Sequence, residues 1–288
     1  MPNPTPDTRP IAVFDSGLGG LTVLEPLVEN LPSESTVYLG DLAHTPYGDK
    51  RPEDIRRFAV AGVQFLAQYN PKALVVACNS ASSVALPDVT REATFPIFDV
   101  ITPGARMAAL HSKSRSIGVI GTTATIQSGA YELELKSLDI NLQVFQADCP
   151  KLAPMIESGL CGVSQYVKVI KECLARLPMR EIDTLILGCT HYPFVRDVFR
   201  AVCGEDIRLI DSGLATAEAL EGALRASGGL VSDPRDETKP ESTIAGTRKY
   251  FVTSANVMHR MEAFREIARD FLGVDSLVVE EATVDTTG

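Results

Sequence analysis

The sequence predicts an α/β protein with mainly parallel, doubly wound sheets, and two features of the chain support this. Short apolar runs rich in Val and Ile recur along it, as in strands that helices cover on both faces. Longer segments whose apolar residues have helical spacing separate these runs. The alternation indicates βαβ units, in which helices pack on both sides of a parallel sheet.

Five apolar runs are expected to be strands, over residues 11–14, 73–77, 117–120, 184–187 and 207–210. Helices are expected over 52–69, 164–177, 213–226 and 258–272. The C-terminal helix needs a sheet to cover, so we expect the chain to return to its first half after Asp211. The stretch 227–248, rich in Gly, Ser, Pro and charge, is expected to be a mobile surface excursion, and the first ten residues to be frayed.

Composition and charge exclude several classes of protein. Of the 288 residues, 45% are hydrophobic and 22% charged, as in a folded globular protein. The 27 Lys and Arg against 37 Asp and Glu give a net charge of −10, so binding to nucleic acid or to an anionic membrane is not expected. The N-terminus lacks the blocks of a signal peptide, and no apolar run approaches the ~20 residues of a membrane span. We therefore expect a cytoplasmic protein.

The cysteines also favour a reducing compartment. Their uneven spacing does not match a secreted disulfide framework, and none forms a C-x-x-C pair. We expect reduced thiols at all six positions, which are Cys78, Cys149, Cys161, Cys173, Cys189 and Cys203.

Polar or nucleophilic side chains follow each expected strand. Ligands of open α/β sheets bind outside the carboxyl ends of the strands, so these clusters indicate one shared site. The chain also looks duplicated, with one cysteine from each half, and we expect one lobe from 1–103 with 212–288 and a second from 104–211. The clusters are Asp15-Ser16-Gly17, Cys78-Asn79-Ser80, Gly121-Thr122-Thr123, Cys189-Thr190-His191 and Asp211-Ser212-Gly213.

Cys78 and Cys189 are the most informative members of these clusters. A cysteine at the end of an apolar strand is by default a small core residue. Here polar side chains follow each one directly, and donors beside a thiolate lower the thiol pKa and make it a usable base. His191 lies two positions after Cys189, so an extended chain would direct both side chains to the same face.

Two turns allow a structural and a functional interpretation. The Gly-rich turn 15–20 can cap a helix or bring backbone N–H groups to an anion, and its glycines do not match a dinucleotide fingerprint. The turn at Tyr47 and Gly48 can be an aromatic anchor or a substrate loop.

Together and in this order, the motifs resemble those of the glutamate racemases, in the cofactor-independent aspartate/glutamate racemase superfamily. The resemblance spans roughly residues 10–214. His191 favours glutamate over aspartate as substrate, because the related aspartate racemases usually carry an acid there. Ser80 departs from the usual Thr but keeps its hydroxyl. The matching segments are 14–20, 46–48, 77–81, 121–125, 188–193 and 211–213.

The resemblance implies two flavodoxin-like lobes with the active site in the cleft between them, no cofactor and no metal. Cys78 and Cys189 would be catalytic bases on opposite faces of the substrate α-carbon, assisted by Asp15 and His191, with Glu157 as a further helper. D-Glutamate would supply peptidoglycan synthesis, and a homodimer is expected. The substrate-binding residues would be Asp15, Ser16, Tyr47, Gly48, Asn79, Ser80, Thr122, Thr190 and His191.

Two other functions remain open at this point. Cys189 as nucleophile and His191 as base would suit a cysteine hydrolase or amidotransferase, although Cys78 would then be idle. Alternatively, two lobes could close on an amino acid without turnover, as in periplasmic-type binding proteins, although a signal peptide is not evident.

Overall fold

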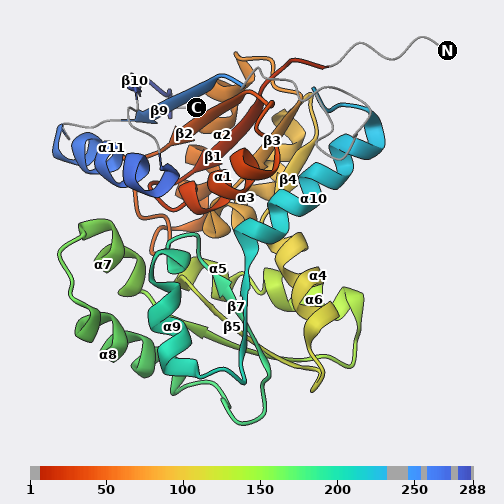
Figure 1. Ribbon diagram of the computed structural model, residues 1–288, viewed down its shortest axis with the longest axis vertical. Coiled ribbons are helices and arrows are strands. Elements are labelled where there is room, and N and C mark those ends of the chain that lie inside the picture. Colours follow the sequence, from red (N-terminus) through yellow and green to blue (C-terminus); the bar gives the residue numbers. More distant parts are fainter. Residues whose placement is uncertain (1–6, 232–245, 254–257, 274–277, 287–288) are drawn as a thin grey trace.

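The computed structural model describes residues 7–231, 246–253, 258–273 and 278–286, and its strands form two parallel sheets (Figure 1). Residues 1–6 and 232–245 lie outside the described residues, and with them most of the segments expected to be frayed or mobile. In the described part of the chain, no helix is both long and apolar enough to cross a membrane.

The larger sheet has six strands, and each neighbouring pair is parallel. It combines strands from the N-terminal third of the chain with two from its C-terminal end. In spatial order they are β10 (Val279–Ala282), β9 (Arg248–Thr253), β2 (Thr36–Gly40), β1 (Ile11–Asp15), β3 (Ala73–Val76) and β4 (Ile97–Asp99).

The smaller sheet has four strands, again all parallel to their neighbours. Their order is β6 (Gln143–Asp148), β5 (Ser116–Gly121), β7 (Thr184–Gly188) and β8 (Arg208–Asp211). The α/β fold class with mainly parallel sheets is thereby confirmed, as are the five expected strands.

Helices cover both faces of each sheet, which explains the continuous apolar runs. On the larger sheet, Ile11 and Val13 pack under α1 (Leu21–Asn30), α10 (Ser212–Ser227) and α11 (Met258–Leu272). Ala12 and Phe14 of the same strand face α2 (Pro52–Ala67) and α3 (Asn79–Glu92). Alternate residues of one strand therefore belong to two different cores.

The smaller sheet repeats this arrangement with shorter helices. One face is covered by α4 (Ile101–His111) and α6 (Ala130–Leu138). The other packs against α7 (Leu152–Ser158), α8 (Val163–Leu174) and α9 (Arg196–Cys203). The short α5 (Thr123–Gln127) follows β5, and a 3-10 turn over Tyr192–Val195 precedes α9. We call the larger sheet with its helices the first lobe and the smaller one the second lobe.

One expectation about the cysteines is wrong. Cys149 and Cys173 form a disulfide, with their Cα atoms 5.6 Å apart, although they are 24 positions apart in the sequence. Cys149 follows β6 and Cys173 lies in α8, so it is the packing of α8 against β6 that brings them together. Sequence spacing alone does not reveal such a pair. Cys78, Cys161, Cys189 and Cys203 are free thiols.

Candidate active site

The carboxyl ends of four strands meet at one small cavity between the lobes. The first lobe contributes the residues that follow β1 and β3, and the second lobe those that follow β5 and β7. The cavity measures about 10 Å³, which is near the minimum that a single water molecule requires. Its lining is Ser16, Pro46, Tyr47, Gly48, Cys78, Asn79, Ser80, Thr122, Ala153, Cys189, Thr190 and His191.

The Gly-rich turn after β1 lets the second lobe approach closely. A Cβ at Gly17 would collide with the Glu157 carboxylate, and one at Gly19 with the side chains of Thr190 and His191. Asp15 closes this turn by accepting the Gly17 N–H at 2.8 Å, and it accepts the Thr190 hydroxyl at 3.3 Å. Burial raises the pKa of the Asp15 carboxyl, although the positive charge of His191 opposes this effect.

Cys78 caps the N-terminus of α3 and is 4% exposed. Its thiol donates to Ser16 Oγ at 3.3 Å. Burial and the nearby charge of Asp15 raise the pKa of the thiol to about 12, although Ser16 and the backbone N–H of Ala81 lower it. The expectation that polar neighbours depress the pKa of this cysteine is therefore wrong, because desolvation outweighs them.

Cys189 has different surroundings, because a charged pair lies beside it. Its Sγ is 3.7 Å from His191 Nδ1, and the other ring nitrogen lies 2.6 Å from Glu157 Oε1. Burial alone would lower the pKa of His191, but its hydrogen bonds to Cys189 and Glu157 raise it well above the usual range. Burial likewise opposes ionisation of Glu157, yet the bond to His191 lowers its pKa. The bonds to Cys189 and Glu157 therefore favour the protonated form of His191 beside the cysteine sulfur.

Glu157 is shared between the lobes. The same carboxylate oxygen that binds His191 also accepts the backbone N–H of Leu18 at 3.2 Å and the Thr45 hydroxyl at 3.3 Å. Glu157 lies in α7 of the second lobe, whereas Leu18 and Thr45 belong to the first. The carboxylate thus holds His191 in place and also links the two lobes.

Hydroxyl and amide groups line the side of the cavity formed by α3 and α5. Ser80 Oγ lies 2.8 Å from Thr122 Oγ1 across the lobe boundary, so the two hydroxyls meet at the wall of the cavity. Asn79 donates through Nδ2 to the Tyr131 hydroxyl at 2.8 Å, also across the boundary. The amide N–H of Ala124 in turn donates to the Gly48 carbonyl at 2.9 Å.

Asp41 and Tyr131 support the cavity from outside, and sequence reasoning missed both. Asp41 is buried and accepts the Tyr47 hydroxyl at 2.6 Å, so Tyr47 faces the cavity without a free hydroxyl. His44 Nδ1 lies 2.9 Å from the same carboxylate. An Asp three positions before His44, shortly ahead of the turn at Tyr47 and Gly48, was the available signal for Asp41. Tyr131 stands in an ordinary amphipathic helix, which carries no such signal.

All but two of the residues predicted for the site line this cavity. The exceptions are Asp15, which contacts the lining residue Thr190, and Glu157, which contacts the lining residue His191. Four of the five predicted clusters contribute to the lining, whereas the expectation that Asp211-Ser212-Gly213 shares the site is wrong, because no residue of that cluster lines the cavity. Strand ends, two thiols and one charged pair therefore share a cavity that sits between two α/β lobes.

These features define a two-lobed α/β protein with one thiol from each lobe at a common site. The model of the Asp/Glu/Hydantoin racemase family matches residues 17–220, and the chain belongs to this family.

Several relatives align with most of the chain. A glutamate racemase from Thermoanaerobacter pseudethanolicus is 39% identical over 88% of this chain and 94% of its own length. The crystal structure of a glutamate racemase isoform from Bacillus anthracis superposes with a TM-score of 0.86 at 37% identity, covering 97% of this chain and 98% of its own. A Francisella tularensis glutamate racemase in complex with D-glutamate has a TM-score of 0.82 at 33% identity, covering 98% and 99%.

Proposed function

We propose that this protein interconverts L- and D-glutamate without a cofactor, using Cys78 and Cys189 as acid and base on opposite faces of the α-carbon. The observation that carries the proposal is the pair of buried thiols, one at the end of β3 and one at the end of β7, at a single cavity. D-Glutamate made in this way would serve peptidoglycan synthesis, the role usual for glutamate racemases.

The surroundings of the two sulfur atoms suggest complementary starting states. The pKa of Cys78, raised to about 12 by burial and Asp15, keeps this residue a thiol that can donate a proton. His191, whose pKa is raised well above its usual value by its hydrogen bonds to Cys189 and Glu157, lies 3.7 Å from Cys189 Sγ, so we assign Cys189 as the base of the first step. The Cys189 thiolate then takes the α-proton of one enantiomer, and the Cys78 thiol gives its proton to the opposite face. Cys189 ends as a thiol and Cys78 as a thiolate, the state that serves the reverse direction.

The carbanion formed between these steps needs electrostatic stabilisation. Hydrogen-bond donors aimed at a developing oxyanion contribute about 3–4 kcal/mol each. The first N–H groups of α3 have no partner inside the helix, and they lie beside Asn79 and Ser80 at the cavity. The hydroxyls of Thr122 and Thr190 add further donors. We assign these groups, with Ser16, Tyr47 and Gly48, to the substrate carboxylates and ammonium.

The proposal is tested by solvent deuterium. In D₂O, L-glutamate converted by two bases yields D-glutamate labelled at the α-carbon, while the unreacted L-glutamate stays unlabelled at early times. We expect Cys78→Ala and Cys189→Ala each to lower racemisation at least about 100-fold, because each removes one proton-transfer group. Chiral chromatography with mass spectrometry measures both quantities.

Cys203→Ala provides the matched control, because Cys203 is a free cysteine outside the cavity, and it should retain full activity. Early label in the unreacted enantiomer would point to a single base. Full activity of either catalytic variant would exclude the two-thiol mechanism. Exchange of aspartate but not of glutamate would reassign the substrate.

Three further assignments belong to this proposal. We place the enzyme in the cytoplasm, where Cys78 and Cys189 would stay reduced, and we propose the lobe boundaries 1–103 with 212–288 and 104–211. We also propose a homodimer, for which the exposed apolar side chains Leu133 and Ile140 offer contact area (71% and 72% exposed). Sedimentation velocity measures the oligomeric state and should show a dimer.

A further inference from the structure

The Tyr131 hydroxyl joins three segments at the centre of the lobe boundary. Tyr131 lies in α6 of the second lobe and is 0% exposed. Its hydroxyl hydrogen-bonds Ser212, the first residue of α10. The hydroxyl also lies against Gly104 of α4, where an added Cβ would be 3.6 Å from the oxygen. It also accepts the Asn79 Nδ2 hydrogen bond at 2.8 Å from the first lobe. One hydroxyl therefore contacts the start of α3 and the helices through which the chain crosses between the lobes.

The other end of the Asn79 amide has no partner. Asn79 is 2% exposed and lines the cavity, yet its Oδ1 makes no hydrogen bond within the described residues. Buried acceptors in folded proteins are nearly always satisfied. An unsatisfied acceptor in the wall of a ligand cavity is one that a ligand completes. It requires a donor, and the donor group of an α-amino acid is its ammonium.

We propose that Tyr131 is a positioning residue that orients the Asn79 amide so that Oδ1 accepts the substrate ammonium. This inference rests on the function proposed above. An amide has a donor end and an acceptor end, and rotation by about half a turn would direct its NH₂ at the ammonium, where two donors repel each other. With Nδ2 bound to Tyr131, the acceptor end is the one left for the ligand. Tyr131 itself is not part of the cavity lining.

The position of Tyr131 also couples recognition to lobe closure. Asn79 and Tyr131 belong to different lobes, so their hydrogen bond exists only when the lobes are together. Closure then orders the acceptor for the ammonium. A ligand with both carboxylates of glutamate but no ammonium does not use this acceptor, so loss of the Tyr131 hydroxyl removes no contact that orients it and should change its affinity much less than that of glutamate.

Tyr131→Phe removes the hydroxyl and keeps the ring. We expect KM for both glutamate enantiomers to rise about tenfold, with kcat changed less than about threefold, because an oriented hydrogen bond to a charged group is lost. Glutarate, which lacks the ammonium, should retain its competitive inhibition constant. If the role of Tyr131 were purely structural, Tyr131→Phe would instead weaken the binding of glutamate and of glutarate to the same extent.

Two further variants complete the test. Tyr250→Phe removes the hydroxyl of another buried tyrosine, in β9 and outside the cavity lining, and should leave KM unchanged. In an Asn79→Ala background, Tyr131→Phe should cause no additional rise in KM, because the amide that it orients is gone. An unchanged KM in Tyr131→Phe, an equal loss of glutarate affinity, or independent effects in the double variant would overturn the proposal. Absence of racemisation by the unaltered protein would instead refute the proposed function.

Discussion

Two residues of the same type receive opposite electrostatic environments in this cavity. Cys78 lies beside a buried carboxylate, Asp15, and its thiol pKa rises to about 12. Cys189 lies beside an imidazolium, which is itself held by Glu157. From the residues alone, donors are expected to lower the pKa of both thiols, and only His191 beside Cys189 sets one cysteine apart. The charges of Asp15 beside Cys78 and of Glu157 beside His191 come from other segments, so their effect is visible only in three dimensions.

The state of His191 depends on Glu157, and this gives a pH-dependent prediction. In Glu157→Gln the negative charge that raises the pKa of His191 is gone, so the imidazolium should lose its proton at lower pH. We expect the basic limb of kcat/KM to move down by about one pH unit or more. The pH profile of racemisation in both directions measures the shift.

Stability should depend on pH in a matching way. His191 has a raised pKa, so its contribution is complete below its usual value of 6.5 and is lost as pH rises through the raised value. Glu157 has a lowered pKa, so its contribution is complete above 4.5 and is lost in acid. The difference in the free energy of unfolding between the unaltered protein and Glu157→Gln should therefore be largest between pH 4.5 and pH 6.5. Glu132→Gln, which replaces an exposed acid of α6, is the control for both measurements and should behave like the unaltered protein. If the basic limb of kcat/KM lay at the same pH in Glu157→Gln as in the unaltered protein, the role assigned to Glu157 would be contradicted.

At the scale of elements, the glycine turn after β1 shows why local patterns identified the site. Gly17 and Gly19 are required because side chains of the second lobe pack directly on the turn. The same sequence suggested a helix cap or an anion site, both of which are local interpretations. The contact with α7 and with the segment after β7 is a tertiary feature, so sequence alone could mark the turn but not explain it.

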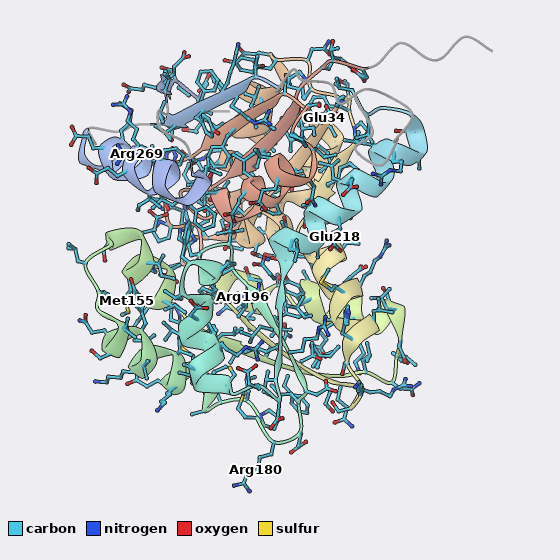
Figure 2. The ribbon with its side chains drawn as sticks, viewed as in Figure 1. Glu34, Met155, Arg180, Arg196, Glu218 and Arg269 are labelled. Carbon is cyan, nitrogen blue, oxygen red and sulfur yellow. A yellow bond between two sulfur atoms is a disulfide. The ribbon has the colours of Figure 1, made fainter. Side chains whose placement is uncertain are left out.

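A buried ion pair ties several elements together at the end of the first lobe away from the second, where Figure 2 labels Glu34. Lys72 Nζ lies 2.5 Å from Glu34 Oε2, and both side chains are 2% exposed. Lys72 also donates to the carbonyls of Asp7 and Gly229, while Glu34 accepts the Val231 N–H at 2.8 Å. The N-terminal segment, the residues before β2 and β3, and the end of α10 are thus joined by charge-assisted bonds.

Lys72→Met should destabilise the folded protein by removing one member of this ion pair. It leaves Glu34 buried without its counter-charge, and removal of one partner of a buried pair typically costs about 3–5 kcal/mol. We expect a loss of this size in the free energy of unfolding, measured in urea, with kcat/KM unchanged in the folded protein because the pair lies far from the cavity. Lys113→Met, at an exposed position of the second lobe, is the control. An unfolding free energy equal to that of the control would show that the pair contributes nothing.

At the scale of the molecule, much of the architecture could be predicted because burial on both faces leaves a strong signal. The runs that became β1, β3, β5, β7 and β8 were identified because helices cover both sides of them. The strands β2, β4, β6, β9 and β10 were missed. β4 has three residues, and β6 is a half-exposed edge strand with polar residues in its sequence, so neither has a continuous apolar run. The disulfide and the cross-lobe bonds of Glu157 and Tyr131 were missed because they join segments distant in sequence.

The closed cavity has a consequence for the whole molecule. About 10 Å³ cannot hold glutamate, so the lobes must separate before substrate enters. The hydrogen bond from the Ala124 N–H to the Gly48 carbonyl, 2.9 Å long, spans the lobe boundary and must break during opening. We expect the Ala124 amide to exchange with solvent at a rate set by opening, and saturating D-glutamate to slow that exchange at least about tenfold by contacting both lobes and holding them together.

Hydrogen exchange followed by NMR measures the exchange rate of the Ala124 amide directly. The Cys149 amide, which bonds to the Gly121 carbonyl at 2.7 Å within the second lobe, is the internal control. Its exchange should not respond to D-glutamate, because opening leaves β5 and β6 paired. Equal protection of both amides by D-glutamate would indicate general stabilisation by the ligand. No protection of Ala124 would show that substrate enters without separation of the lobes and would contradict this prediction.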